Sequence, residues 1–138
     1  MGNVDKALVE KARELLNKSL LTTTLSTVDK DYNVNVAVIT VVEMIDDETI
    51  LCARFGADQT YANLKETGKG VFMVLVAGEQ GKKDGVRVYV RLVDDLTEGP
   101  YYERIKARLE KTPYGQFPLK NCLVFKVTGI APISMLKK

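Results

Sequence analysis

The chain has 138 residues, enough for one domain with a substantial hydrophobic core. Hydrophobic residues make up 46% of the sequence and charged residues 28%, which is typical of a folded globular protein and argues against disorder. Lys and Arg total 20 and Asp and Glu total 18, so the net charge of +2 gives no electrostatic reason to expect nucleic acid. The composition therefore favours a small molecule or another protein as the partner.

Several common chemistries are excluded by the residues that are absent or isolated. The sequence contains no His, which removes the commonest general base, the usual zinc ligand and the proximal ligand of most haem proteins. Cys52 and Cys122 lie far apart and form no metal-type cluster, so we expect two buried thiols and no metal site. No segment approaches the ~18 apolar residues of a membrane span, and Asp5 and Lys6 stand where a signal peptide would be apolar. A cytoplasmic location without membrane contact is expected.

The first half of the chain predicts a helix followed by a hairpin. Apolar residues recur at helical spacing over residues 4–18, which indicates an amphipathic helix. Residues 20–28 alternate Leu with Thr and Ser, as in a strand, and the polar segment 29–33 has the composition of a turn. Residues 34–44 are apolar except for three positions, so we expect one long strand that is covered on both faces.

A strand predicted over residues 49–55 leads directly into a short helix over residues 59–66, which Gly68 closes. Arg54 stands at the end of this strand, and Gln59 and Thr60 begin the helix. A cation and unbonded helix-terminal N–H groups thus converge, which favours an anion-binding site. From the residues alone, Arg54 is better explained as a solvated or ion-paired surface residue.

The second half predicts three more strands and a helix. Residues 71–77 form an apolar strand, residues 86–92 alternate in polarity, and residues 123–127 alternate again. Residues 100–111 carry apolar side chains at helical spacing, with Pro100 in the first turn. The pattern predicts a mainly β (α+β) fold, a six-stranded antiparallel barrel with a short inserted helix and flanking helices.

The sequence also resembles a known family. Residues 25–29, LSTVD, are followed by NVAV at residues 35–38, and this order resembles the FMN-binding split-barrel family related to pyridoxamine 5′-phosphate oxidase. The resemblance covers roughly residues 20–130 and implies that residues 1–138 form a single split-barrel domain. It also implies an FMN cofactor, with FAD or a deazaflavin remaining as alternatives, and a homodimer that holds the flavin in the cleft between its subunits.

The resemblance further assigns cofactor contacts to particular positions. In the family, the second strand contacts the flavin, and the end of the third strand and the start of the inserted helix hold the phosphate. An aromatic residue before the last strand often contacts the flavin of the neighbouring subunit, although loop packing explains such a residue here equally well. The positions implied are Val36, Ala37, Val38, Ile39, Thr40, Cys52, Ala53, Arg54, Gln59, Thr60 and Phe117.

Dimerisation has its own support in the residues. The apolar strands 34–44 and 71–77 would expose a hydrophobic face on a small monomeric barrel, and a two-fold contact would cover it. Val41 is expected to face this interface.

Three functions remain open from the sequence. The preferred one is an FMN-dependent oxidoreductase that passes electrons between a small-molecule donor and acceptor. The second is a flavin-binding or electron-carrying module without its own substrate. The third is a flavin-free ligand-binding barrel, suggested by Gln59 at a position where a basic phosphate ligand is common. Oxidation of pyridoxamine 5′-phosphate itself is not expected, because residues 131–138 lack the Arg and His of the true oxidases.

Overall fold

A computed structural model describes residues 5–56, 58–77 and 79–133. The described part contains a seven-stranded sheet, three α-helices and one short 3₁₀ turn. None of these helices has the length and apolar character needed to cross a membrane. The elements, in chain order, are α1 (Lys6–Lys18), β1 (Thr23–Val28), β2 (Val34–Ile39), β3 (Val42–Met44), β4 (Thr49–Arg54), α2 (Gln59–Thr67), β5 (Lys69–Ala77), η1 (Glu79–Gly81), β6 (Lys83–Leu96), α3 (Pro100–Glu110) and β7 (Asn121–Pro132).

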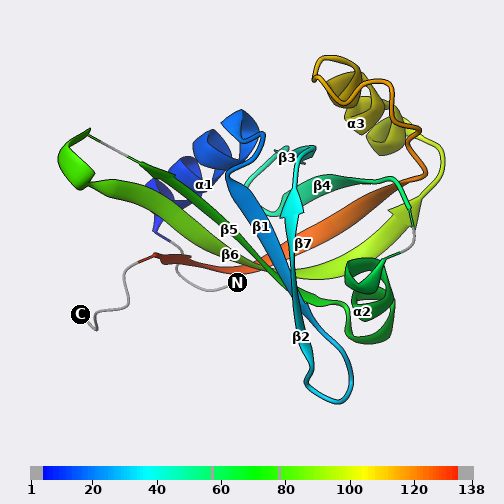
Figure 1. Cartoon of the computed structure of the whole chain (residues 1–138), viewed down its shortest axis with the longest axis horizontal. Coiled ribbons are helices and arrows are strands. Elements are labelled where there is room, and N and C mark those ends of the chain that lie inside the picture. The colour runs from blue at the N-terminus through cyan, green and yellow to red at the C-terminus, as the bar shows by residue number, and fades with distance from the viewer. Residues whose placement is uncertain (1–4, 57, 78, 134–138) are drawn as a thin grey trace.

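All neighbouring strands are antiparallel, and their order across the sheet is β2-β1-β5-β6-β7-β4-β3. Strands β2 and β3 therefore lie at opposite edges of the sheet, although only Thr40 and Val41 separate them in the chain. So short a connection requires the sheet to curl until its two edges meet. The result is the expected mainly β (α+β) split barrel, from which the β1–β2 and β5–β6 hairpins project (Figure 1).

The prediction of one long strand over residues 34–44 is wrong, and this accounts for the seventh strand. Strand β2 pairs with β1, whereas β3 pairs with β4, so the chain leaves one edge and joins the other at Thr40 and Val41. The Ala53 N–H donates to the Val41 carbonyl at 3.0 Å and fixes the crossing. Two strands also extend beyond their predicted limits, because β6 and β7 form a long ladder with two register shifts.

The main core fills the inside of the curled sheet. Leu25, Phe72 and Phe125 are fully buried there, and the rings of Phe72 and Phe125 meet edge to face with centroids 5.2 Å apart. Helix α1 covers this core with Ala12 and Leu16, both fully buried, so its predicted amphipathic pattern matches its packing. The N-terminal part of the predicted helix, residue 4, lies outside the described residues.

A second, smaller core lies between α3 and the strands β4 and β7. Val41 belongs to it with only 1% of its surface exposed, packed in a cluster with Ile105 and Leu109. The prediction that Val41 faces an interface is therefore wrong, because the crossing between the two edges turns this side chain inward. Arg104 of α3 donates two hydrogen bonds to the Glu43 carboxylate, at 2.9 and 3.0 Å, and ties the helix to β3.

Candidate functional site

A pocket of about 140 Å³ lies where the two edges of the curled sheet meet, and we call it the seam pocket. One wall comes from β2 and the residue after it, the other from β4, and the first turn of α2 closes one end. The pocket brings together eight of the eleven residues that the sequence implicated: Ala37, Val38, Ile39, Thr40, Cys52, Ala53, Arg54 and Thr60.

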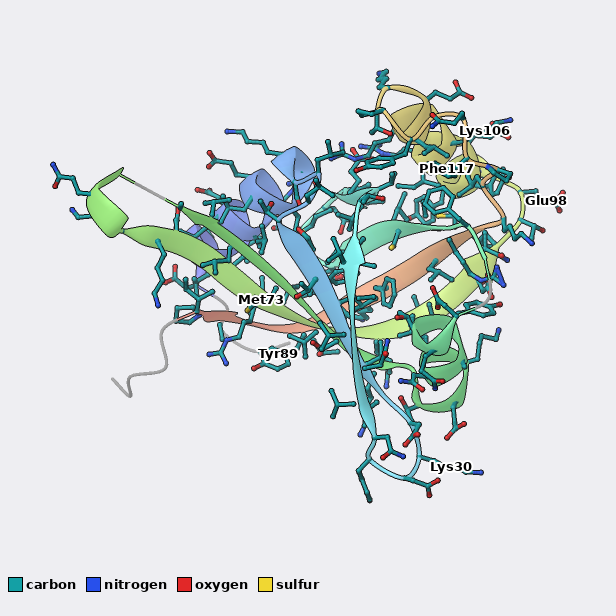
Figure 2. All side chains as sticks on the ribbon, viewed as in Figure 1. Lys30, Met73, Tyr89, Glu98, Lys106 and Phe117 are labelled. Carbon is teal, nitrogen blue, oxygen red and sulfur yellow. The ribbon has the colours of Figure 1, made fainter. Side chains whose placement is uncertain are left out.

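The other three predicted residues do not line this pocket. Val36 belongs to the outer face of β2, where 61% of its surface is exposed. The Gln59 side chain donates instead to the Asn63 side chain at 2.7 Å. Phe117 is 48% exposed beside α3 (Figure 2), and its ring centroid lies 6.2 Å from that of Phe55, which does line the pocket.

Arg54 is the most informative side chain of the pocket. Its Nε and Nη1 atoms are buried, and neither has a hydrogen-bond partner among the described residues. Its guanidinium carbon lies 3.7 Å from the centroid of the Tyr61 ring. A buried cation without an acceptor is costly, and protein structures seldom leave one unpaired. The arrangement fits a site whose acceptor is an anionic ligand.

The start of α2 adds hydrogen-bond donors at the same end of the pocket. The Asp58 carboxylate caps the helix by accepting from the Tyr61 N–H at 2.8 Å. The N–H groups of Gln59 and Thr60 precede the first intrahelical bond and so have no partner within the helix. Buried Thr60 accepts from the Asn35 side chain at 3.0 Å, which leaves its own hydroxyl proton for another acceptor.

Tyr61 is held by a second group, the carboxylate of Asp95 on strand β6. Its hydroxyl donates to Asp95 Oδ2 at 2.5 Å, and Lys65 Nζ lies 3.4 Å from the same oxygen. The hydrogen bond to Asp95 raises the pKa of the Tyr61 phenol above its ordinary value, so the hydroxyl keeps its proton near neutral pH. The other Asp95 oxygen, Oδ1, is buried and has no partner among the described residues.

Cys52 contributes an apolar wall and no reactive group. Burial raises the pKa of its thiol to about 12, and burial likewise raises the pKa of Cys122 to about 12. Since a thiolate is the reactive form of cysteine, both side chains are inert near neutral pH. The prediction of two buried, unpaired thiols is confirmed.

The outer face of the sheet carries a row of exposed apolar side chains next to the pocket. The strand register places Val36, Ser26, Val71 and Tyr89 in one row and Val38 and Met73 in the adjacent row, because directly opposed residues share a face. In Figure 2, Met73 and Tyr89 lie on the arm formed by β5 and β6. We call this surface of β1, β2, β5 and β6 the outer apolar face. Its exposed apolar members are Val34, Val36, Val38, Met73, Leu75 and Tyr89.

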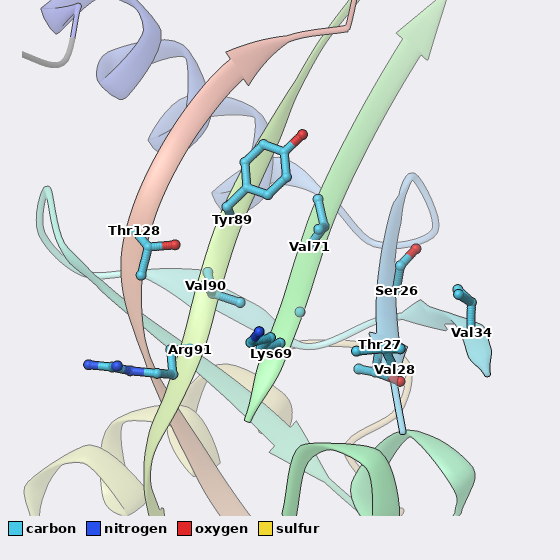
Figure 3. Close-up of a pocket in the computed structure, with 11 residues that line it drawn as sticks. Ser26, Thr27, Val28, Val34, Lys69, Val71, Tyr89, Val90, Arg91 and Thr128 are labelled. Carbon is cyan, nitrogen blue, oxygen red and sulfur yellow. The ribbon is translucent and has the colours of Figure 1, made fainter. Parts of the chain in front are cut away.

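This face is hollowed by a cavity of about 500 Å³. Figure 3 shows its lining side chains rising from β1, β2, β5, β6 and β7, with Tyr89 and Val71 on neighbouring strands. Lys69 and Arg91 also line the hollow, so it combines apolar and cationic surface. Val38 belongs to both the outer apolar face and the seam pocket, which makes the two surfaces continuous.

Comparison with known proteins identifies the family to which the chain belongs. No protein-family model and no curated protein matches the chain. Among solved structures, an FMN-binding protein from Syntrophomonas wolfei subsp. wolfei is 64% identical, with a TM-score of 0.91 over 96% of this chain and 90% of that one. The chain belongs to the FMN-binding split-barrel family.

Two more distant structures share the split-barrel fold. HupZ of Group A Streptococcus is 21% identical, with a TM-score of 0.74 over 91% of this chain and 94% of that one. A protein of the pyridoxinephosphate oxidase family from Clostridium acetobutylicum is 14% identical, with a TM-score of 0.68 over 97% of this chain and 93% of that one. At these identities the likeness concerns the fold alone.

Within this split barrel, sequence reasoning missed two residues, Tyr61 and Asp95, at the candidate anion-binding end of the pocket. The sequence places Tyr61 in the first helical turn, directly after Thr60, but it does not predict that the Tyr61 ring contacts Arg54. Asp95 lies 34 residues beyond Tyr61. Only the extension of β6 past its predicted end brings Asp95 to α2, and the alternation of residues 86–92 gave no sign of that extension.

Proposed function

We propose that this chain binds FMN, with the phosphate at the seam pocket, and acts as an FMN-dependent oxidoreductase on a small molecule in the cleft of a homodimer. The observation that carries the proposal is the partly buried Arg54 guanidinium, whose buried Nε and Nη1 atoms have no acceptor among the described residues. A phosphate dianion fits it, because an arginine fork and helix-terminal N–H groups are the usual donors to phosphate. The 64% identity to an FMN-binding protein supports the same ligand.

In this proposal each wall of the pocket has its own part. Arg54, the Thr60 hydroxyl and the first N–H groups of α2 hold the phosphate. Ala37, Ile39 and Ala53 line the adjoining walls with apolar surface that excludes water. FMN supplies the electron chemistry when bound, and the protein supplies binding, orientation and access.

The size of the pocket supports a site that a second subunit completes. Pockets for ligands of this size usually have about 300–1,000 Å³. The seam pocket has only about 140 Å³, which suits the phosphate end and leaves the rest of the cofactor to be covered from elsewhere. The outer apolar face adjoins the pocket at Val38, and exposed apolar faces of this kind mark contact surfaces. A second copy of the chain, packed by two-fold symmetry on this face, would cover both.

A flavin-carrying module is the second candidate, and one observation favours it. Among the described residues that line the pocket, Tyr61 and Cys52 have shifted pKa values, and both pKa values are raised, away from neutrality. The pocket thus offers no general acid or base poised near pH 7. A flavin-free barrel is less compatible with the buried Nε and Nη1 atoms of Arg54, which have no partner among the described residues.

The absorption spectrum of the native protein, followed by mass spectrometry of the released cofactor, tests the proposal. We expect flavin bands and the mass of FMN, whereas FAD or a deazaflavin would correct the ligand. A colourless protein that takes up no added FMN would refute it. Reduction of the bound flavin by a nicotinamide donor, with turnover in the presence of an acceptor, would identify an oxidoreductase. Bound flavin without turnover with any donor would indicate the carrier.

A further inference from the structure

Arg54 needs support to act as a selective phosphate ligand. Its long side chain has many rotamers, and holding one of them costs entropy. The contact that fixes its guanidinium among the described residues is the face of Tyr61, 3.7 Å from the guanidinium carbon. A planar cation over an aromatic face is attracted by the ring and keeps its N–H edge free for a ligand.

The Tyr61 ring is itself held at both ends. Its backbone N–H is fixed by the Asp58 cap at 2.8 Å, and its hydroxyl is fixed by Asp95 at 2.5 Å. The Asp95 side chain is only 14% exposed and comes from β6, so α2 and the sheet are joined through this bond. Lys65 lies on the same carboxylate at 3.4 Å and offsets its charge.

We infer that Tyr61 and Asp95 are positioning residues that aim Arg54 at the ligand and thereby set the preference for a phosphorylated flavin over an unphosphorylated one. The inference rests on the proposed function, because it names the residues behind the same phosphate site. Neither Tyr61 nor Asp95 needs to touch the phosphate. Their effect passes through the guanidinium, which distinguishes them from Arg54 itself.

The test measures the affinities for FMN and riboflavin of the full-length protein, freed of flavin, by fluorescence titration. These ligands differ only in the phosphate, so the ratio of their dissociation constants reports phosphate selectivity. We expect Tyr61→Leu to weaken FMN by about tenfold and to leave riboflavin unchanged, since the lost contact acts on the charged group alone. Tyr61→Phe keeps the ring and should lose less than Tyr61→Leu. Asp95→Asn keeps an acceptor for the hydroxyl and should also lose less than Asp95→Ala.

A matched control and a double variant separate positioning from packing. Tyr102→Phe removes a hydroxyl that donates to the Leu119 carbonyl at 3.2 Å; neither residue lines the pocket, so this change should leave both affinities unchanged. In an Arg54→Ala background, Tyr61→Leu should cause no further loss of FMN affinity, because the group that it positions is gone. Thermal unfolding checks that each variant is folded. If Tyr61→Leu does not fold, Tyr61→Phe and Asp95→Asn test the same contact.

The outcomes distinguish this inference from the proposed function. If Arg54→Ala lowers FMN affinity selectively while Tyr61→Leu changes neither ligand or weakens both equally, the positioning role is overturned and the phosphate site stands. If Arg54→Ala weakens the binding of FMN and riboflavin equally, or if the unaltered protein binds no FMN, then both the positioning role and the proposed function are refuted. Selective, non-additive losses at Tyr61 and Arg54 support both.

Discussion

Replacing Val36 by Glu tests whether the outer apolar face and the cofactor site depend on the same dimer. Val36 lies on the edge strand β2 with 61% of its surface exposed, at the end of the row that includes Val71 and Tyr89. It does not line the seam pocket, so its replacement leaves the phosphate site intact within one subunit. An exposed strand position of this kind changes the stability of a monomer by only about 0.5 kcal/mol.

The expected effect on the proposed dimer is much larger. Complete burial of a Val side chain is worth about 1.5–3 kcal/mol, so covering the exposed 61% contributes roughly 1 kcal/mol in each subunit. An unpaired carboxylate in the interface adds several kcal/mol, and two-fold symmetry introduces two of them. A total of at least about 5 kcal/mol raises the dimer dissociation constant by between three and four decades.

Analytical ultracentrifugation with flavin detection follows both properties on one sample. We expect Val36→Glu to sediment as a folded monomer and to release its FMN, whereas Val36→Thr, which keeps the shape of the side chain, remains a dimer with FMN bound. A folded Val36→Glu monomer that holds FMN with unaltered affinity would show that one subunit suffices for the site. A dimer that survives the substitution would show that the outer apolar face is not the interface.

Three further predictions concern stability and reactivity. The Arg104 hydrogen bonds lower the pKa of Glu43 below its ordinary value, so the pair stabilises the fold above that ordinary value and this contribution is lost as the pH falls through the lowered pKa. Glu43→Gln should therefore cost about 0.5–1 kcal/mol at pH 7 in urea unfolding, because Arg104 is half exposed, and progressively less as the pH falls through the lowered pKa; a cost that does not decrease at low pH would contradict this. Gly85→Ala would place a Cβ 2.3 Å from the Val74 carbonyl oxygen of the paired strand and should cost ~2 kcal/mol, whereas Gly56→Ala meets nothing within 4 Å; equal effects would refute the contact. Cys52, with a pKa of about 12, should react with a thiol reagent at pH 8 only after unfolding, and rapid labelling of the folded protein would contradict its burial.

The sequence predicts the parts of this fold that depend on local pattern. The spacing of α1, the alternation of β1 and the helix that follows Arg54 all appear where periodicity places them. The break between β2 and β3 was not predictable from hydrophobicity, since both the crossing residue Val41 and the strand residues on either side are buried or apolar. Tertiary pairing decides it, because β2 and β3 bond to different neighbours.

The candidate site likewise contains some residues that the local pattern predicts and others that it does not. Arg54 and Thr60 are separated by six positions, and their convergence follows from a strand that ends directly before a helix. Asp95 reaches Tyr61 only through the long β6, and Phe117 is drawn to Phe55 and Tyr114 by aromatic packing with centroids 6.2 Å apart. Contacts between distant segments depend on register and strand length, which a single sequence determines poorly.

The position of the pocket is a consequence of the topology. Strand β2 bonds to β1 alone and β4 bonds to β7 and β3, so the two strands come together around the curl without a shared ladder. Where a closed barrel would have hydrogen bonds, this sheet has a seam lined by side chains, and Thr40 and Val41 close one end of it. Arg54 ends β4 beside this seam, and α2 begins five residues later, so the cation and the helix N-terminus meet beside the seam. Alternate residues of β2 also belong to the outer apolar face. A subunit that covers Val36 would therefore lie next to Ala37 and Val38, which line the pocket. In the proposed dimer, cofactor binding and subunit contact would thus be linked through a single strand, and this linkage is why a charge at Val36 is expected to disturb both.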